Sequence, residues 1–258
     1  MIASLFVAFS VVAAVVIEKK TVTQQISLHD NTRGQLSRLS NAVIQYYLFN
    51  TLTPNRYPCP APVNVLPTAA SFGVAITNCH AGQALPAGTT GLPNNVAADP
   101  YIRGMVPVIT LAPYGIKLED AFDQWGNRIM YVVDRNLVPT GTGIASATRA
   151  TLTEWNLGTI MLSSDFLTIS YGRDKLGAFP KGLASTTPAI ACVVSDTQIR
   201  DNNCNGALDF INGPNRTGSR VAVDNYFDDV VSSYSNTVPS GGCSIWGAFN
   251  WGLGQWCP

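Results

Sequence analysis

One short stretch of the sequence has residue types and spacing suited to binding a metal ion. Residues 201–209 read "DNNCNGALD", which fits the first half of a calcium loop, D-x-N-x-N-G, with Gly206 at the sharp turn. The twelfth position is Asn212 instead of the bidentate Glu of an EF-hand, so that family is not implied. An ordinary Asn-Gly turn is the alternative. The expected oxygen ligands are Asp201, Asn203, Asn205 and Asp209.

The six cysteines are a second set of residues with chemistry of their own. They allow fifteen pairings, and pairing in sequence order closes the shortest loops. None has the C-x-x-C spacing of a zinc site, and His29 and His80 are the only histidines that could complete one. We therefore expect disulfides, and a head outside the cytoplasm. The predicted pairs are Cys59 with Cys79, Cys192 with Cys204, and Cys243 with Cys257.

Aromatic residues are concentrated at the end of the chain, in "GGCSIWGAFNWGLGQWCP". If Cys243 bonds Cys257, the closed loop has little room to bury all of its large rings. We expect packing against the head or a neighbouring subunit, and keep an adhesive loop as the second interpretation, since rigid aromatics bind surfaces at low entropic cost. The residues concerned are Trp246, Phe249, Trp251 and Trp256.

The remaining titratable residues do not form a recognisable catalytic pattern. Neither His29 nor His80 lies in a nucleophile-elbow context, and the sequence has no phosphate-binding Gly loop with lysine. Adjacent acids such as Glu119-Asp120 and Asp228-Asp229 point in different directions on a strand or share a solvated turn. We expect a protein that is not an enzyme.

The N-terminal segment is the first element that positions these residues. "MIASLFVAFSVVAAVVIEKK" has no charge before Glu18, no basic start and no clear cleavage site, which argues against a signal peptide. As a helix, residues 1–17 would be about 25 Å long, at the short end of a membrane span. We expect a retained anchor that inserts in the membrane and later packs in an assembly through Leu5, Phe6, Phe9, Val12 and Val16.

A second apolar pattern follows the polar stretch at 21–35. Apolar residues at spacings of three and four predict one buried face of a helix, and no Pro occurs before Pro54. A single helix from near Met1 to about Asn50 is expected, loosened around Asn31 and Gly34. The apolar face consists of Leu36, Leu39, Val43, Tyr47 and Leu48.

The composition describes the rest of the chain. Acidic and basic residues are equal in number, and 12% of residues are charged, against about 25% in typical soluble proteins. No basic excess indicates nucleic acid as a partner. With 22 Gly and 16 Pro, residues 51–258 are predicted to form one loop-rich, strand-rich head after a 1–50 spine, with strands at "RIMYVVD" and "FLTISYG". The expected class is α+β, with an antiparallel sheet.

In this arrangement the chain resembles the type IV pilin and type II secretion pseudopilin superfamily. "MIASLFVAFSVVAAVV" is similar to the prepilin segment from its M-I onward, and Leu5 stands where a glutamate would be expected if the chain starts at Met1; otherwise the family's glutamate precedes it. Four later motifs are similar in order. They are "RYPCPAP" at 56–62, "DQWGNRIMYVV" at 123–133, "LTISYGRDKLGAF" at 167–179, where Lys175 replaces a common glycine, and "NYFDDVVSS" at 225–233.

The resemblance implies a minor-pilin-like filament subunit whose partners are copies of itself or other pilins. It implies an inner-membrane location before assembly, and then an extracellular pilus or a periplasmic pseudopilus. It also favours calcium at 201–209, since some pseudopilins hold this ion in acidic loops. Two alternatives remain: a membrane-tethered adhesive or binding protein that does not polymerise, and an anchored hydrolase.

Overall fold

The computed structural model describes the chain from a long N-terminal helix to the last strand of the head. The residues it describes are 2–92, 95–139, 153–156, 159–161, 164–173, 175–190, 209–212, 230–234, 249–250 and 255–256. The helix α1 spans Ile2–Phe49 without a break at Asn31 or Gly34. The predicted single long helix is therefore confirmed, and the predicted loosening is not seen.

A five-stranded antiparallel sheet forms the centre of the head. Its order is β1-β2-β3-β6-β8. The inner strands β3 and β6 are rich in β-branched and aromatic residues, which suit a pleated surface. Both strands that the sequence predicts are found. The bounds are β1 Thr90–Leu92, β2 Tyr101–Met105, β3 Met130–Asp134, β6 Phe166–Ser170 and β8 Val230–Tyr234.

Smaller elements surround this sheet. A second sheet has the order β5-β4-β7, and its β4 and β7 run parallel, which the expected antiparallel head did not include. The strands β9 and β10 pair antiparallel, and two short 3₁₀ helices, η1 and η2, precede β3. The bounds are β4 Thr153–Asn156, β5 Thr159–Met161, β7 Asp209–Asn212, β9 Phe249–Asn250, β10 Gln255–Trp256, η1 Ala112–Tyr114 and η2 Leu118–Ala121.

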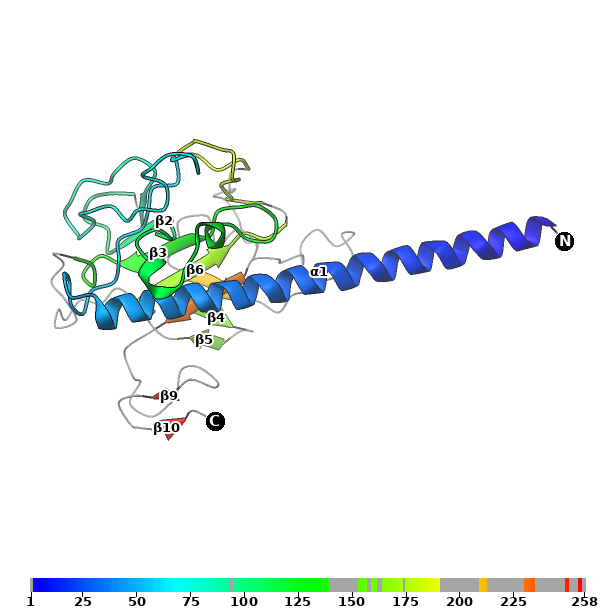
Figure 1. The fold of residues 1–258 in the computed structure, drawn as a ribbon, viewed down its shortest axis with the longest axis horizontal. Helices are drawn as coiled ribbons and strands as arrows, with labels where there is room; N and C mark the ends of the chain where they lie inside the picture. Colours follow the sequence, from blue (N-terminus) through cyan, green and yellow to red (C-terminus); the bar gives the residue numbers. More distant parts are fainter. Residues whose placement is uncertain are drawn as a thin grey trace.

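The C-terminal half of α1 packs on the sheet at β6 and β8, whereas its N-terminal half extends beyond the head (Figure 1). The predicted stripe Leu36, Leu39, Val43 and Tyr47 is buried. Leu48 is 56% exposed, so its assignment to this stripe is wrong. Successive helix residues turn by about 100°, which carries Leu48 away from the face that contains Tyr47.

Both faces of the sheet are covered. All five residues of β3 and all five of β6 are buried, which requires material on each side. Loop residues from 57–76 join the same hydrophobic core as α1, among them Tyr57, Val63 and Phe72. This region is the loop lobe at 57–99, and its described residues have little regular structure apart from β1.

A disulfide fixes the loop lobe to itself. Cys59 and Cys79 are bonded, with 6.0 Å between their Cα atoms. Both residues are buried. The first predicted pair is confirmed, and the α+β class with a strand-rich, disulfide-stapled head is found.

Candidate functional site

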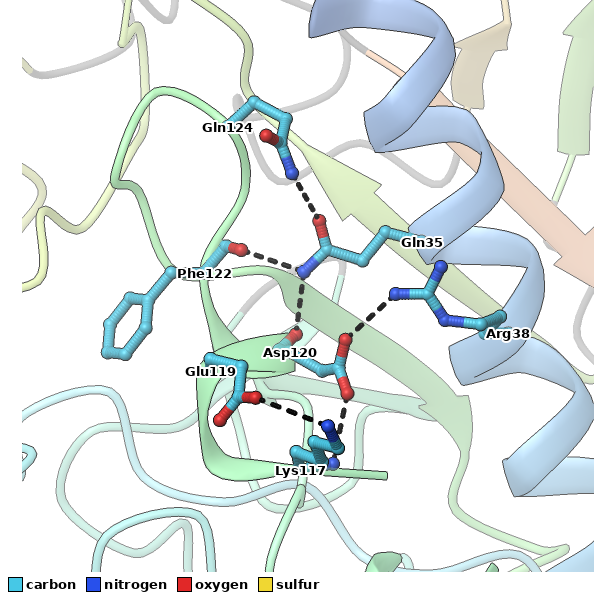
Figure 2. A network of polar contacts seen from close by, with 7 residues as sticks. All are labelled: Gln35, Arg38, Lys117, Glu119, Asp120, Phe122 and Gln124. Atoms are coloured by element: carbon cyan, nitrogen blue, oxygen red, sulfur yellow. Dashed lines mark hydrogen bonds and ion pairs between the residues drawn. The ribbon is translucent and has the colours of Figure 1, made fainter. Parts of the chain in front are cut away.

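The junction between α1 and the head begins at Gln35, a polar residue on the buried side of the helix. Its Nε2 donates to the carbonyl oxygens of Asp120 at 3.1 Å and Phe122 at 2.7 Å (Figure 2). Its Oε1 accepts from Nε2 of Gln124 at 3.5 Å. The two carbonyls lie at the end of η2, where helix geometry leaves acceptors without internal donors. Gln35 therefore joins α1 to the segment that leads into β3.

An ion pair strengthens the same junction one turn further along. Nη2 of Arg38 lies 3.0 Å from Oδ1 of Asp120, whose side chain is only 12% exposed. The other oxygen, Oδ2, accepts the backbone N–H of Lys117 at 2.9 Å and so caps η2 (Figure 2). Because the Asp120 carboxylate makes both contacts, it holds the start of η2 against α1.

Ser40 makes the contact between α1 and the sheet itself. Its Oγ lies 3.2 Å from Oγ1 of Thr168 on β6 and 3.1 Å from Oγ of Ser232 on β8. Three small hydroxyl residues allow the helix to approach the strands closely while their polar atoms remain hydrogen-bonded.

Aromatic rings continue the junction to the C-terminal end of α1. Tyr47 stacks on Tyr57 with ring centroids 4.6 Å apart, and Tyr57 contacts Phe166 at 5.2 Å. Phe166 in turn stacks on Tyr234 at 5.5 Å. The hydroxyl of Tyr57 donates to Oδ2 of Asp165 at 3.0 Å. Burial, and then the nearby Asp165 carboxylate, raise the pKa of Tyr57 well above its usual value.

Two motifs that carry the family resemblance contact each other around Asp123. Its Oδ1 accepts the backbone N–H groups of Trp125 at 3.0 Å and Asn127 at 2.8 Å, and Gly126 between them has φ 78°. Its Oδ2 accepts the Ser170 hydroxyl at 2.7 Å. Burial raises the pKa of Asp123, and these hydrogen bonds act in the opposite direction. The D-x-W-G-N turn is thus tied to the end of β6.

The loop after β6 has the backbone of a glycine-rich turn. Gly172, Lys175 and Gly177 have φ values of 57°, 62° and 77°. The carbonyl of Gly172 accepts Nδ2 of Asn127 at 2.8 Å. Lys175 stands where glycine is common in the similar pilin motif. Its backbone has a left-handed conformation, which glycine adopts without strain.

Two buried arginines hold the loop segments on the sheet, and sequence reasoning missed them. Arg135 donates from Nε to the Cys79 carbonyl at 2.8 Å and from Nη2 to the His80 carbonyl at 2.6 Å. Its remaining guanidinium bonds reach the carbonyls of Gln83, Ala97 and Asp99. Burial lowers the pKa of Arg135. It joins the disulfide to the rest of the loop lobe.

Arg128 has the same role at the other end of β3. Its guanidinium donates to the carbonyls of Val63, Lys181 and Leu183, and it lies over the Phe72 ring, 5.5 Å from the centroid. A recognisable signal was present: Arg128 is the first residue of the strand predicted at "RIMYVVD", and Arg135 directly follows that strand.

The predicted calcium ligands are not tested by this geometry. Asp201, Asn203 and Asn205 lie outside the described residues, and Asp209 is the first residue of β7. Within the ranges given above, no three His, Cys, Asp or Glu side chains cluster in a way that could hold a metal. Outside the described residues lie also Cys192, Cys204, Cys243 and Cys257.

The structure describes part of the C-terminal aromatic loop. Phe249 on β9 is paired with Trp256 on β10, and Asn250 with Gln255. Trp246 and Trp251 lie outside the described residues.

The predicted assembly residues all fall within the helical backbone of α1. They are Leu5, Phe6, Phe9, Val12 and Val16. In the portion of the chain that the structure describes, no helix meets the combined length and hydropathy required of a membrane span. His29 is buried on α1, and burial lowers its pKa.

No family model, curated protein or solved structure matches the chain.

Proposed function

We propose that the chain is a structural subunit of a helical filament, a pilin-like component of a type IV pilus or a secretion pseudopilus. The observation that carries the proposal is the division of α1. Its C-terminal half is fixed to the head by Gln35, Ser40 and Tyr47, while the uncharged segment at 2–17 continues the same helix beyond the head (Figure 1). One continuous helix of this kind can hold the head at a fixed position relative to an apolar core made by neighbouring copies.

The contact between the D-x-W-G-N turn and the loop after β6 supports the family assignment. These two motifs are far apart in the sequence, yet Asp123 and Asn127 bond directly to Ser170 and Gly172. Their positive φ values at Gly126, Gly172 and Gly177 explain why glycine occurs at these positions. Two motifs that occur together in one family are expected to contact each other in this way.

The role proposed is structural, with no catalytic step. The subunit resides in the inner membrane before assembly and then enters an extracellular pilus or periplasmic pseudopilus. Its partners are copies of itself or other pilins. Calcium at Asp201, Asn203, Asn205 and Asp209 remains a prediction, which melting the protein in calcium and in chelator would test.

Introducing a charge into the apolar segment tests assembly. Val12→Asp should abolish filaments, because a carboxylate cannot be buried among apolar helices at acceptable cost. Filaments are sheared from producing cells, quantified and imaged. The matched control is Val74→Asp, at a half-exposed position of the loop lobe. Normal filament yield from Val12→Asp would contradict the proposal.

A membrane-tethered adhesive protein that does not polymerise is the second candidate. The observation that favours it is the antiparallel pairing of β9 with β10, in which Phe249 and Trp256 are partners in the register. Aromatic residues suit contact with an uncharged surface. Surface attachment that is lost in Trp256→Ala, in cells that produce no filament, would favour this candidate.

A further inference from the structure

The C-terminal end of α1 carries an exposed apolar patch that the head does not use. Leu48, Phe49 and Leu52, the head-end patch, are 56%, 68% and 90% exposed. These residues are close in sequence, and large side chains this exposed are uncommon in a group. Scattered single leucines would need no explanation, but a group at one end of a helix indicates a contact surface.

The head-end patch is held in a defined shape. The N–H of Asn50 continues the helix to the Tyr46 carbonyl at 2.9 Å, and the Asn50 carboxamide oxygen accepts the N–H of Leu52 at 3.0 Å. Nδ2 of the same residue donates to Oγ1 of Thr53 at 2.8 Å. Since this turn is ordered by its own hydrogen bonds, Leu52 is presented to solvent without a cost of ordering on contact.

The distribution of charge along α1 indicates what the patch binds. Residues 2–17 and residues 39–55 contain no charged side chain, whereas all charges of the helix lie between them, at 18–38. An uncharged apolar surface is best covered by another uncharged apolar surface. The chain itself supplies one such surface, at the other end of the same helix.

We propose that the head-end patch of one copy receives the uncharged N-terminal segment, residues 2–17, of a second copy. The two surfaces are different, so the contact is heterologous, and a heterologous contact that does not close produces an open polymer. With a rise of about 1.5 Å per residue, the patch and the middle of the segment are about 60 Å apart along one helix. Each contact would therefore place the second copy further along the axis.

This inference rests on the proposed filament function and names the surface that such a filament uses. A benzophenone amino acid at position 52 of the full chain tests it, in cells that assemble the wild-type filament. On illumination we expect a product of dimer mass, and digestion after lysine should join the labelled peptide to one that ends at Lys19. Position 66 is the control, because Leu66 is exposed on the loop lobe, outside the patch.

A charge variant gives a second measurement. Leu52→Asp should reduce filament yield at least tenfold and leave the melting temperature of the full chain unchanged, while Leu66→Asp retains normal yield. A product of monomer mass whose digest joins the labelled peptide to another peptide of the same chain would show that this part of the chain covers the patch, and absence of any dimer at position 52 in assembled filaments would likewise overturn the inference. Normal yield from Leu52→Asp, together with loss of filaments in Val12→Asp, would overturn it and leave the filament function intact. Absence of wild-type filaments would contradict both the proposed contact and the proposed filament function.

Discussion

The α1 junction and the loop lobe are fixed to the same sheet by different chemistry. The helix satisfies its own backbone hydrogen bonds, so a buried apolar stripe, two neutral polar residues and one ion pair suffice to attach it. The loop lobe has few backbone ladders, and its carbonyls need external donors. Arg135 and Arg128 supply them from the two ends of β3, and the disulfide closes the loop. Regular structure thus decides how much buried charge each region requires.

The largest expected effect comes from removing the donor of the loop lobe. Arg135→Met leaves five carbonyl contacts without a donor and should lower the free energy of unfolding by about 3 kcal/mol. The matched control at the α1 junction is Arg38→Met, whose guanidinium is largely exposed and should cost less than about 1 kcal/mol. Urea unfolding measures both. Equal losses of unfolding free energy in the two variants would contradict the claim that the loop lobe depends more on buried charge than the α1 junction does.

An intermediate effect is expected at Asp123, where the segment leading into β3 meets the end of β6. Asp123→Asn keeps the turn oxygen but replaces the acceptor of the Ser170 hydroxyl, which should cost about 1 to 2 kcal/mol. Asp30→Asn, on the exposed side of α1, is the control.

The same variant should alter the pH dependence of stability. Because the folded pKa of Asp123 is raised, the folded state binds its proton more tightly than the unfolded chain does. Its contribution is fully present below the unfolded value of 3.8 and declines as the pH rises through the folded pKa. Asp123→Asn should lack this decline in urea titrations across the acidic range. If Asp123→Asn loses stability with rising pH as the wild type does, other titratable groups cause the decline.

The smallest expected effect is a gain in stability. Lys175→Gly should raise the free energy of unfolding by about 0.5 to 1 kcal/mol, since φ 62° costs a residue with Cβ more than it costs glycine. Lys175→Ala keeps the Cβ and should give no gain. Thermal unfolding of the two variants side by side would reveal the difference, and a destabilised glycine variant would refute this explanation.

Sequence periodicity predicted the elements well where one physical pattern dominates. The spacing of Leu36, Leu39, Val43 and Tyr47 indicated the buried face, and the same reasoning failed for Leu48 because spacing of one is not a helix-face period. The Cys59 and Cys79 pair followed from loop length.

The polar contacts of the junction were not predictable in the same way. Gln35 belongs to the mostly polar stretch at 21–35, and its Nε2 donates to backbone carbonyls 85 and 87 residues away. Arg135 likewise bonds to carbonyls, which every residue carries and no sequence pattern marks. The parallel pairing of β4 with β7 depends on long-range packing that local propensity does not encode.

Imaging of filaments sheared from producing cells by electron cryomicroscopy tests the central claim most directly. The account predicts a helical polymer in which α1 of this chain lies inside, with residues 2–17 packed among neighbouring copies and the five-stranded sheet outside. A chain recovered only from the membrane fraction, with no polymer that contains it, would contradict the account.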